Sequence, residues 1–337
     1  MGISATTDTT AIGHGRANLQ FDGLARVVRR SEESQGVVSI ELVSAEPDAE
    51  LPVWEPGAHV DVTLDNGLVR QYSLSGDPGD RGVWRLGILR EVDGRGGSKW
   101  IHDVLRSGDT IAVRGPRNNF PLVDSSRYIF LAGGIGITPI LPMIREAARR
   151  GADWSLHYGG RTRSTMAFLD ELAALDGGSG RVVVHPQDEE GILDLPGILG
   201  TPGEGTAVYC CGPVGLIDAT ERFSLSWQRG RLHVERFAAS PSSVGSESND
   251  AIEVVCDQSG VTLEVPPELS ILEAVENAGL QVMSSCTEGI CGSCETRVIS
   301  GEPDHRDSLL TEEERESGET MLICVSRART ARLVLDL

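Results

Sequence analysis

Short apolar runs broken by turns fill the chain from residue 19 to 122. The runs are GVVSIELVS, HVDVTL, RQYSLS, VWRLGILR and TIAVRGP. Several short strands at this spacing, each bounded by turn residues, are typical of an antiparallel β-barrel. One helical patch follows GRGGS, where the apolar residues between Trp100 and Leu105 recur at helical spacing.

The pattern changes at Arg127, where apolar strand-like runs begin to alternate with helix-like segments. The strand-like runs are RYIFLAGG, WSLHYGG, RVVVHPQ, AVYCCGP and RLHVERF, and the helix-like ones are ILPMIREAARR and STMAFLDELAAL. Strands that alternate with helices favour a parallel sheet covered by helices, the α/β architecture of nucleotide-binding domains.

Polar, serine-rich sequence separates this region from the end of the chain. The segment AASPSSVGSESND has no apolar periodicity, which is typical of a linker. We therefore predict a multidomain protein with a separate module at its C-terminus. The predicted parts are a disordered tail at 1–18, a barrel at 19–122, an α/β domain at 123–237, a linker at 238–250 and the last module at 251–337.

Charge narrows the classes of partner. The 337 residues include 50 acidic and 30 basic side chains, a net charge of −20, which argues against nucleic-acid binding. Residues 251–337 hold 17 acidic and 6 basic residues, either as a solubilising surface or as a docking face for a basic partner. Without a secretory signal or an apolar run of about 18 residues, a cytoplasmic protein is expected.

Three of the seven cysteines lie close together in SSCTEGICGSC. Cys286, Cys291 and Cys294 form C-x4-C-x2-C, and Cys324 follows thirty residues later. This is the spacing of a plant-type [2Fe–2S] cluster. Zinc is the alternative, but structural zinc sites tend to use paired short spacings. The pattern favours the iron–sulfur cluster and leaves Cys256 as an ordinary buried thiol.

Four further motifs are weak when taken singly. In RQYSLS, side chains alternate along a strand, so Arg70 and Tyr72 share one face. In GRGGSKW, a glycine-rich turn leads into a helix whose first N–H groups suit a phosphate. LAGGIGITP and YCCGP each end a strand-like run, and two such ends on one parallel sheet can frame a dinucleotide.

Taken in order, these motifs resemble the phthalate dioxygenase reductase family. The ordered set is R-x-Y-S, G-R-G-G-S, G-P-R-N-x-F-P-L, G-G-I-G-I-T-P, C-C-G-P and C-x4-C-x2-C. The resemblance implies an FMN-binding barrel, an NAD domain and an α+β plant-type ferredoxin domain with a [2Fe–2S] cluster. It implies a reductase component that passes electrons from NADH through FMN and the cluster to a terminal oxygenase, in aromatic-compound oxidation or demethylation.

The same resemblance assigns residues to each cofactor. For FMN it implies Arg70, Gln71, Tyr72, Ser73, Gly87, Ile88, Leu89, Gly96, Gly97 and Ser98. For the nicotinamide nucleotide it implies Gly134, Gly136, Thr138, Pro139, Cys211, Gly212 and Pro213. Near the reacting atoms it implies Ser73, Thr138, Cys211 and Phe237, with Phe237 beside the flavin ring. FMN in place of FAD rests on the resemblance alone.

Nucleotide and partner stay open in part. Arg161 and Arg163 stand where the family can carry an acidic residue, so NADH is favoured but NADPH remains possible. The family favours a Rieske non-haem iron oxygenase as partner of a monomeric reductase, with a cytochrome P450 as the second choice. A free-standing reductase of flavins, quinones or ferric chelates, and a redox sensor that is not an enzyme, are the alternatives.

Overall fold

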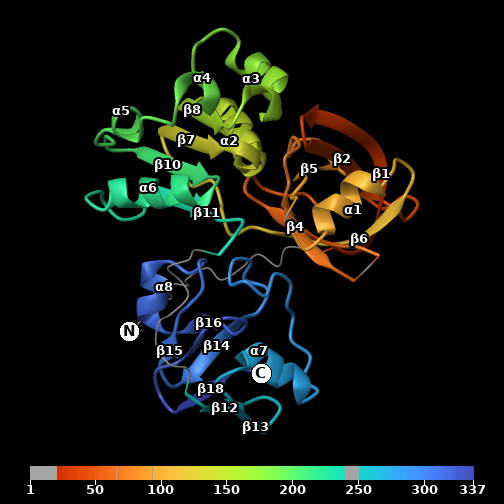
Figure 1. Ribbon diagram of the computed structural model, residues 1–337, viewed down its shortest axis with the longest axis vertical. Coiled ribbons are helices and arrows are strands. Elements are labelled where there is room, and N and C mark those ends of the chain that lie inside the picture. Colours follow the sequence, from red (N-terminus) through yellow and green to blue (C-terminus); the bar gives the residue numbers. More distant parts are fainter. Residues whose placement is uncertain (1–20, 66, 93, 240–249) are drawn as a thin grey trace, which may run out of the picture.

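The computed structural model describes residues 21–65, 67–92, 94–239 and 250–337 (Figure 1). The predicted tail at 1–18 and nearly all of the predicted linker at 238–250 lie outside these residues. Three main sheets form three bodies in sequence order, which confirms the predicted multidomain fold class. In Figure 1 the barrel and the α/β domain lie side by side, and the third body, in blue, lies below both.

The first body is a six-stranded antiparallel sheet in the order β4-β3-β6-β1-β2-β5. Its elements are β1 (Phe21–Ser34), β2 (Val37–Ser44), β3 (His59–Thr63), β4 (Val69–Ser73), β5 (Trp84–Leu89), α1 (Gly97–Asp103) and β6 (Thr110–Arg117). An antiparallel bridge between Leu74 and Leu86 joins the two edges of the sheet. Alternate residues of the strands point into the interior. Among them, Ile40, Leu42 and Trp84 have no solvent-exposed surface.

The long first strand is absent from the sequence prediction. In β1 only Ala25 and Val27 are buried, because its second half is polar and its outer face, including Leu24 and Val28, is exposed. The strand is nevertheless central, since it pairs with β2 on one side and β6 on the other. Backbone pairing therefore decides its conformation, where side-chain alternation gives a weak signal.

The second body is a five-stranded parallel sheet in the order β11-β10-β7-β8-β9. Its strands are β7 (Arg127–Gly133), β8 (Asp153–Gly160), β9 (Val182–Pro186), β10 (Thr206–Cys211) and β11 (Leu232–Glu235). Its helices are η1 (Gly134–Gly136), α2 (Ile137–Arg149), η2 (Arg163–Thr165), α3 (Leu169–Asp176), α4 (Gln187–Glu190), α5 (Leu195–Leu199) and α6 (Val214–Ser224).

Residues of β7 alternate between two cores on opposite faces of this sheet. Tyr128 and Phe130 pack with α2 and α3, whereas Ile129 and Leu131 pack with α5 and α6. Helices thus cover both faces, as the alternating pattern predicts. One boundary differs from the sequence expectation. The helix expected from Ser164 begins only at Leu169, because Phe168 before it takes a left-handed backbone conformation with φ 62°.

The third body combines a five-stranded sheet in the order β13-β12-β18-β14-β16 with a two-stranded sheet of β15 and β17. Its elements are β12 (Ile252–Cys256), β13 (Val261–Val265), α7 (Ile271–Asn277), β14 (Glu295–Ser300), β15 (Pro303–Asp304), α8 (Glu312–Ser317), β16 (Thr320–Leu322), β17 (Arg327–Ala328) and β18 (Arg332–Leu335). A capping box between Ser270 and Glu273 starts α7, whose apolar face packs into the core. None of the helices in the described residues is long and apolar enough to span a bilayer.

Candidate functional site

One cavity of about 1030 Å³ lies where the three bodies meet. Its wall includes Tyr72 and Ser73 from β4, Thr138 from α2, Phe237 just after β11, and Cys286 from the third body. Such a volume is at the upper end of the range for small-molecule and cofactor sites. Residues from all three predicted functional regions therefore face the same space.

The barrel side of the cavity is prepared for an anion. The Nη2 of Arg70 is buried and has no hydrogen-bond partner, while its Nη1 donates to the carbonyl of Val69 at 2.7 Å. Burial and then the nearby Arg95 lower the pKa of Arg70. Because two guanidinium groups repel one another unless an anion lies between them, a phosphate fits this position.

Glycine makes room for this arginine. A Cβ at Gly97, the first residue of α1, would lie 2.8 Å from the Cγ of Arg70. Gly96 precedes it with φ 90°, a backbone conformation that favours glycine. The hydroxyl of Ser98 accepts a hydrogen bond from the backbone N–H of Glu91 at 3.0 Å, which leaves its own O–H free to donate. Gly97 and Ser98 thus line the cavity beside Arg70, whereas Gly96 forms the turn before them.

Strand β5 brings the barrel against the α/β domain. Gly87 and Leu89 line the cavity, whereas the side chain of Ile88 points into the barrel core, as alternation along a strand requires. A Cβ at Gly87 would lie 2.7 Å from the Cγ2 of Thr138. Any larger residue would therefore push the two domains apart at the cavity.

The two glycine-rich strand ends of the α/β sheet are in direct contact. A Cβ at Gly136 would overlap the carbonyl of Cys211, and one at Gly212 would lie 2.8 Å from the Cα of Gly133. Pro213 packs against Gly133 in the same way. Gly134, with φ 53°, faces open space. The structure thus brings LAGGIGITP and YCCGP together at the carboxyl ends of β7 and β10.

Of the seven predicted nucleotide residues, only Thr138 lines the cavity. Its hydroxyl donates to the carbonyl of Ile135 at 2.9 Å. Pro139 is buried in the first turn of α2, and Cys211 has no solvent exposure. Burial raises the pKa of the Cys211 thiol well above its usual value. A nicotinamide contact with Cys211 stays a prediction.

Glu235 is a residue that the sequence reading of HVERF missed. It lines the cavity at the end of β11, and its carboxyl hydrogen-bonds to Ser73. The thiol of Cys211 lies 4.0 Å from its Oε2. Although the cavity exposes part of the side chain, burial raises the pKa of Glu235 to about 8. The group is therefore neutral at pH 7 and lies beside two predicted reacting-site residues.

The four patterned cysteines are all buried and form two pairs. The thiol of Cys286 hydrogen-bonds to that of Cys291, and the thiol of Cys294 to that of Cys324. Within the described parts of the chain, no three His, Cys, Asp or Glu side chains form a site for a single metal ion. Two pairs of thiolates match two irons, each of which takes two ligands from the protein in a [2Fe–2S] cluster.

Backbone groups support these sulfurs. The N–H of Glu288 donates to the Sγ of Cys286 at 3.3 Å, and the N–H of Ser293 to the Sγ of Cys291 at 3.4 Å. Gly289 and Gly292 both have positive φ, which turns the segment tightly enough for these contacts. Such hydrogen bonds to sulfur are among the groups that set a cluster's potential.

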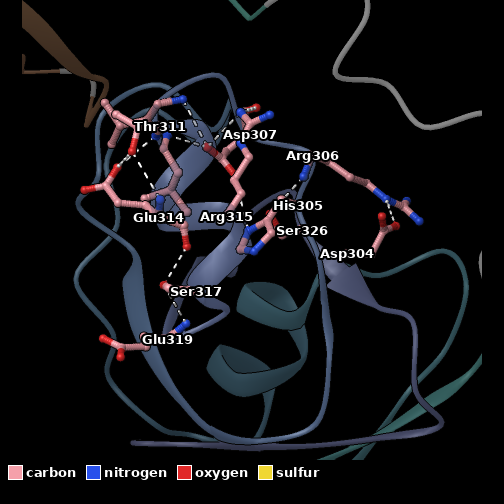
Figure 2. Close-up of polar contacts among 12 residues, drawn as sticks. Asp304, His305, Arg306, Asp307, Thr311, Glu314, Arg315, Ser317, Glu319 and Ser326 are labelled. Atoms are coloured by element: carbon pink, nitrogen blue, oxygen red, sulfur yellow. Dashed lines mark hydrogen bonds and ion pairs between the residues drawn. The ribbon is translucent and has the colours of Figure 1, made fainter. Parts of the chain in front are cut away.

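The loop before α8 is held by polar contacts of Asp307 and Arg315 (Figure 2). Asp307 is 1% exposed, and its Oδ2 accepts hydrogen bonds from the backbone N–H groups two and three residues later. Arg315 donates to the carbonyl of Asp307 at 2.6 Å. The N–H of Ser308 donates to the carbonyl of Gly289 at 2.9 Å. The loop before α8 is therefore fixed to the cysteine segment.

Comparison with known proteins agrees with this division. The family model described as "2Fe-2S iron-sulfur cluster binding domain" matches residues 254–329, and the model described as "Oxidoreductase NAD-binding domain" matches residues 130–222. The chain is 42% identical over 289 residues to the phenoxybenzoate dioxygenase subunit beta of Ectopseudomonas oleovorans. That match covers 85% of this chain and 89% of the relative.

Two solved structures extend the match to all three bodies. The structure of phthalate dioxygenase reductase, described as a modular structure for electron transfer from pyridine nucleotides to [2Fe–2S], is 36% identical. It covers 94% of this chain and 98% of its own, with a TM-score of 0.68. The chain belongs to the phthalate dioxygenase reductase family. An intact type IV self-sufficient cytochrome P450 monooxygenase is 41% identical with a TM-score of 0.87, covering 94% of this chain and 41% of its own.

Membership of the phthalate dioxygenase reductase family settles what the chain carries and what class of enzyme it is. It is an oxygenase-type reductase that uses a nicotinamide nucleotide, FMN and a [2Fe–2S] cluster. The residues present fit each group: an unpartnered arginine for the FMN phosphate, facing glycines for the nucleotide, and paired buried thiols for the cluster.

Replacing one cluster ligand is expected to remove the iron without emptying the barrel. Purified protein should hold about two irons and two acid-labile sulfides. Cys291→Ser should lose both while FMN remains bound, because Arg70 and Gly97 lie in the barrel, whose core is separate from that of the third body. Cys256→Ala is the matched control, since that thiol is buried in the same module outside the four. Zinc without sulfide in the wild type would contradict the assignment.

Glu235 is expected to give flavin reduction a pH dependence. Below about pH 8 its carboxyl is neutral, and ionisation above that pH places a negative charge at the cavity that opposes arrival of a hydride. Stopped-flow rates of flavin reduction by NADH should fall above pH 8 in the wild type and stay level in Glu235→Gln.

Stability supplies an independent readout of the same group. A carboxyl whose folded pKa is raised favours the unfolded state increasingly as pH rises from about 4.5 to 8. The Tm of Glu235→Gln minus that of the wild type should therefore increase as pH rises from about 4.5 to 8. Above pH 8 this difference should stay constant. Identical pH profiles for the two proteins would show that Glu235 titrates normally.

Proposed function

We propose that electrons from NADH cross the three-domain cavity to the cluster and leave for a Rieske non-haem iron oxygenase that acts on an aromatic compound. The observation that carries this proposal is the shared wall, in which Tyr72, Thr138 and Cys286 face one space. Two predicted redox sites around a single cavity need no diffusing carrier between them. Two relatives with aromatic-acid dioxygenase names support the choice of partner.

Each wall has a separate task in this scheme. FMN, when bound, accepts the two electrons of a hydride and releases them one at a time. Arg70 and Gly97 would hold its phosphate, and Tyr72 would pack along its ring. Ser73 and the neutral Glu235 form a hydrogen-bonded pair that would face the hydride-accepting edge of the flavin, and Phe237, 41% exposed, would cover the ring from the α/β side.

The cluster wall passes electrons outward. Cys286 lines the cavity, whereas Cys291, Cys294 and Cys324 do not. We therefore assign Cys286 to the side that receives the electron from the flavin. The acidic residues of the third body then serve as the docking face for a basic oxygenase surface, since opposite charges steer encounter and fix orientation.

A cytochrome P450 is the second candidate partner. The TM-score of 0.87 to part of a self-sufficient P450 supports it, because that protein joins a module of this kind to its oxygenase. We propose that the reductase works as a monomer with either partner.

NADH is the proposed donor because, of the two arginines that could bind the 2′-phosphate of NADPH, Arg161 and Arg163, the second is already in an ion pair. Arg163 lies 3.3 Å from Glu189 of α4, which reduces its attraction for a 2′-phosphate. We expect kcat/KM for NADH to exceed that for NADPH by at least about tenfold. Glu189→Gln should narrow the ratio by freeing Arg163, and Glu190→Gln, which affects a neighbouring carboxylate of α4, should not. A preference for NADPH in the wild type would overturn the choice.

Reconstitution with purified oxygenases tests the proposed partner. We expect NADH oxidation to couple to product formation with a Rieske oxygenase of an aromatic acid, and to slow as salt rises from about 50 to 500 mM. Ferricyanide reduction, which needs no docking, is the control and should respond little. If NADH oxidation couples to product formation with a P450 but not with a Rieske oxygenase, the P450 is the partner. If oxygenase turnover and ferricyanide reduction respond equally to salt, the acidic residues do not form the docking face.

A further inference from the structure

The cluster loop, residues 284–294, is held by side chains of the barrel at three places. Ser285 donates its hydroxyl to the Oδ1 of Asp61 at 3.1 Å. Asn119 donates its amide to the carbonyl of Cys291 at 3.0 Å. Arg95 lies 2.9 Å from Glu288. Each contact reaches a cluster cysteine or a residue within two positions of one.

Asp61 is the buried member of this set. It is 2% exposed, and both oxygens are paired with Arg117 at 2.7 and 2.8 Å. Arg114 adds a third contact at 3.2 Å. Although burial opposes its ionisation, the hydrogen bonds and charge of Arg117 lower the pKa of Asp61 to about 2. The carboxylate is therefore charged across the working pH range and fixed in orientation.

Gln71 connects this carboxylate to the flavin wall. Its Nε2 donates to the Oδ1 of Asp61 at 3.1 Å and to the hydroxyl of Ser285 at 3.3 Å. On β4 it stands between Arg70 and Tyr72, which line the cavity with it. One triangle of side chains thus links the strand at the flavin to the residue before Cys286.

The other two contacts are weaker restraints. The side chains of Arg95 and Glu288 are 52% and 40% exposed, and exposed ion pairs contribute little stability. Asn119 is a neutral donor to one backbone carbonyl. Hydrogen bonds to a buried, charged acceptor are stronger than neutral ones. Asp61 is therefore the group best suited to fix the cluster loop.

We propose that Asp61 is a positioning residue that holds the cluster loop against the flavin wall through Ser285, and thereby sets the rate of electron transfer from flavin to cluster. The inference rests on the electron path proposed above. It concerns one step only. NADH delivers two electrons with its hydride, and these leave the flavin singly for the cluster and then for the oxygenase, so NADH oxidation itself needs no contact with Ser285.

Ser285→Ala tests the contact in the full-length holoenzyme. In stopped flow with NADH, we expect cluster reduction, followed by its absorbance and paramagnetic signal, to slow by about tenfold, as small displacements of reacting groups do. Flavin reduction should keep the wild-type rate. Ser284→Ala is the matched control, because that hydroxyl donates to Glu276 at 3.3 Å within the third body and does not reach the barrel.

A structural readout accompanies the kinetics. Hydrogen–deuterium exchange in residues 284–294 should speed up in Ser285→Ala and stay at the wild-type rate in Ser284→Ala. Iron, sulfide and FMN content should match the wild type in both variants. Unchanged exchange together with unchanged cluster reduction in Ser285→Ala would overturn the proposal.

Asp61→Asn tests whether the carboxylate acts through Ser285. It removes the charge but keeps the shape, and we expect slower cluster reduction with the same loosening of the cluster loop. The double variant should be no slower than the slower single one, because both remove one contact. Additive effects would overturn the link between the two residues, and if Asp61→Asn does not fold, Ser285→Ala alone decides. A wild-type protein whose cluster NADH does not reduce would instead refute the electron path.

Discussion

The cavity depends on three close approaches that only glycine permits, one between the barrel and the α/β domain and two within those domains. Gly87 meets Thr138, Gly97 meets Arg70, and Gly136 meets Cys211, each at a distance that leaves no space for a Cβ. Two of these contacts shape the flavin wall and the third joins the nucleotide-binding strand ends. Because electron and hydride transfer depend on short separations, these close approaches fix where the chemistry can occur.

Two charged side chains with buried polar atoms differ in whether those atoms have partners. Arg70 is left with an unpartnered Nη2 that faces a phosphate position. Asp61 is fully paired by Arg117 and Arg114 and still accepts from Ser285 of another domain. An unsatisfied buried donor is costly unless a ligand satisfies it, whereas a satisfied buried carboxylate gives rigidity. The first arrangement suits cofactor binding and the second suits domain positioning.

Local signals in the sequence predict much of this arrangement. The cysteine spacing and the ordered glycine motifs identify the cluster and the nucleotide-binding strand ends, because each depends on residues close together in the chain. The pKa of Glu235 depends on burial that HVERF does not reveal. Asp61 and Ser285 are 224 positions apart, so no local pattern indicates their contact. Strand β1 is likewise missed, since its pairing and not its polarity places it in the sheet.

The electron path is tested most directly by removing the cluster-bearing module. A chain that ends at Ala239 retains the cores of the barrel and the α/β domain, which are separate from the core of the third body. We expect it to bind FMN and to oxidise NADH with ferricyanide, but not to drive the oxygenase. The separate module, residues 250–337, should restore only part of the rate, because tethering supplies a local concentration that diffusion does not. Full oxygenase turnover by the shortened chain alone would contradict the account, since the cluster would then lie off the path.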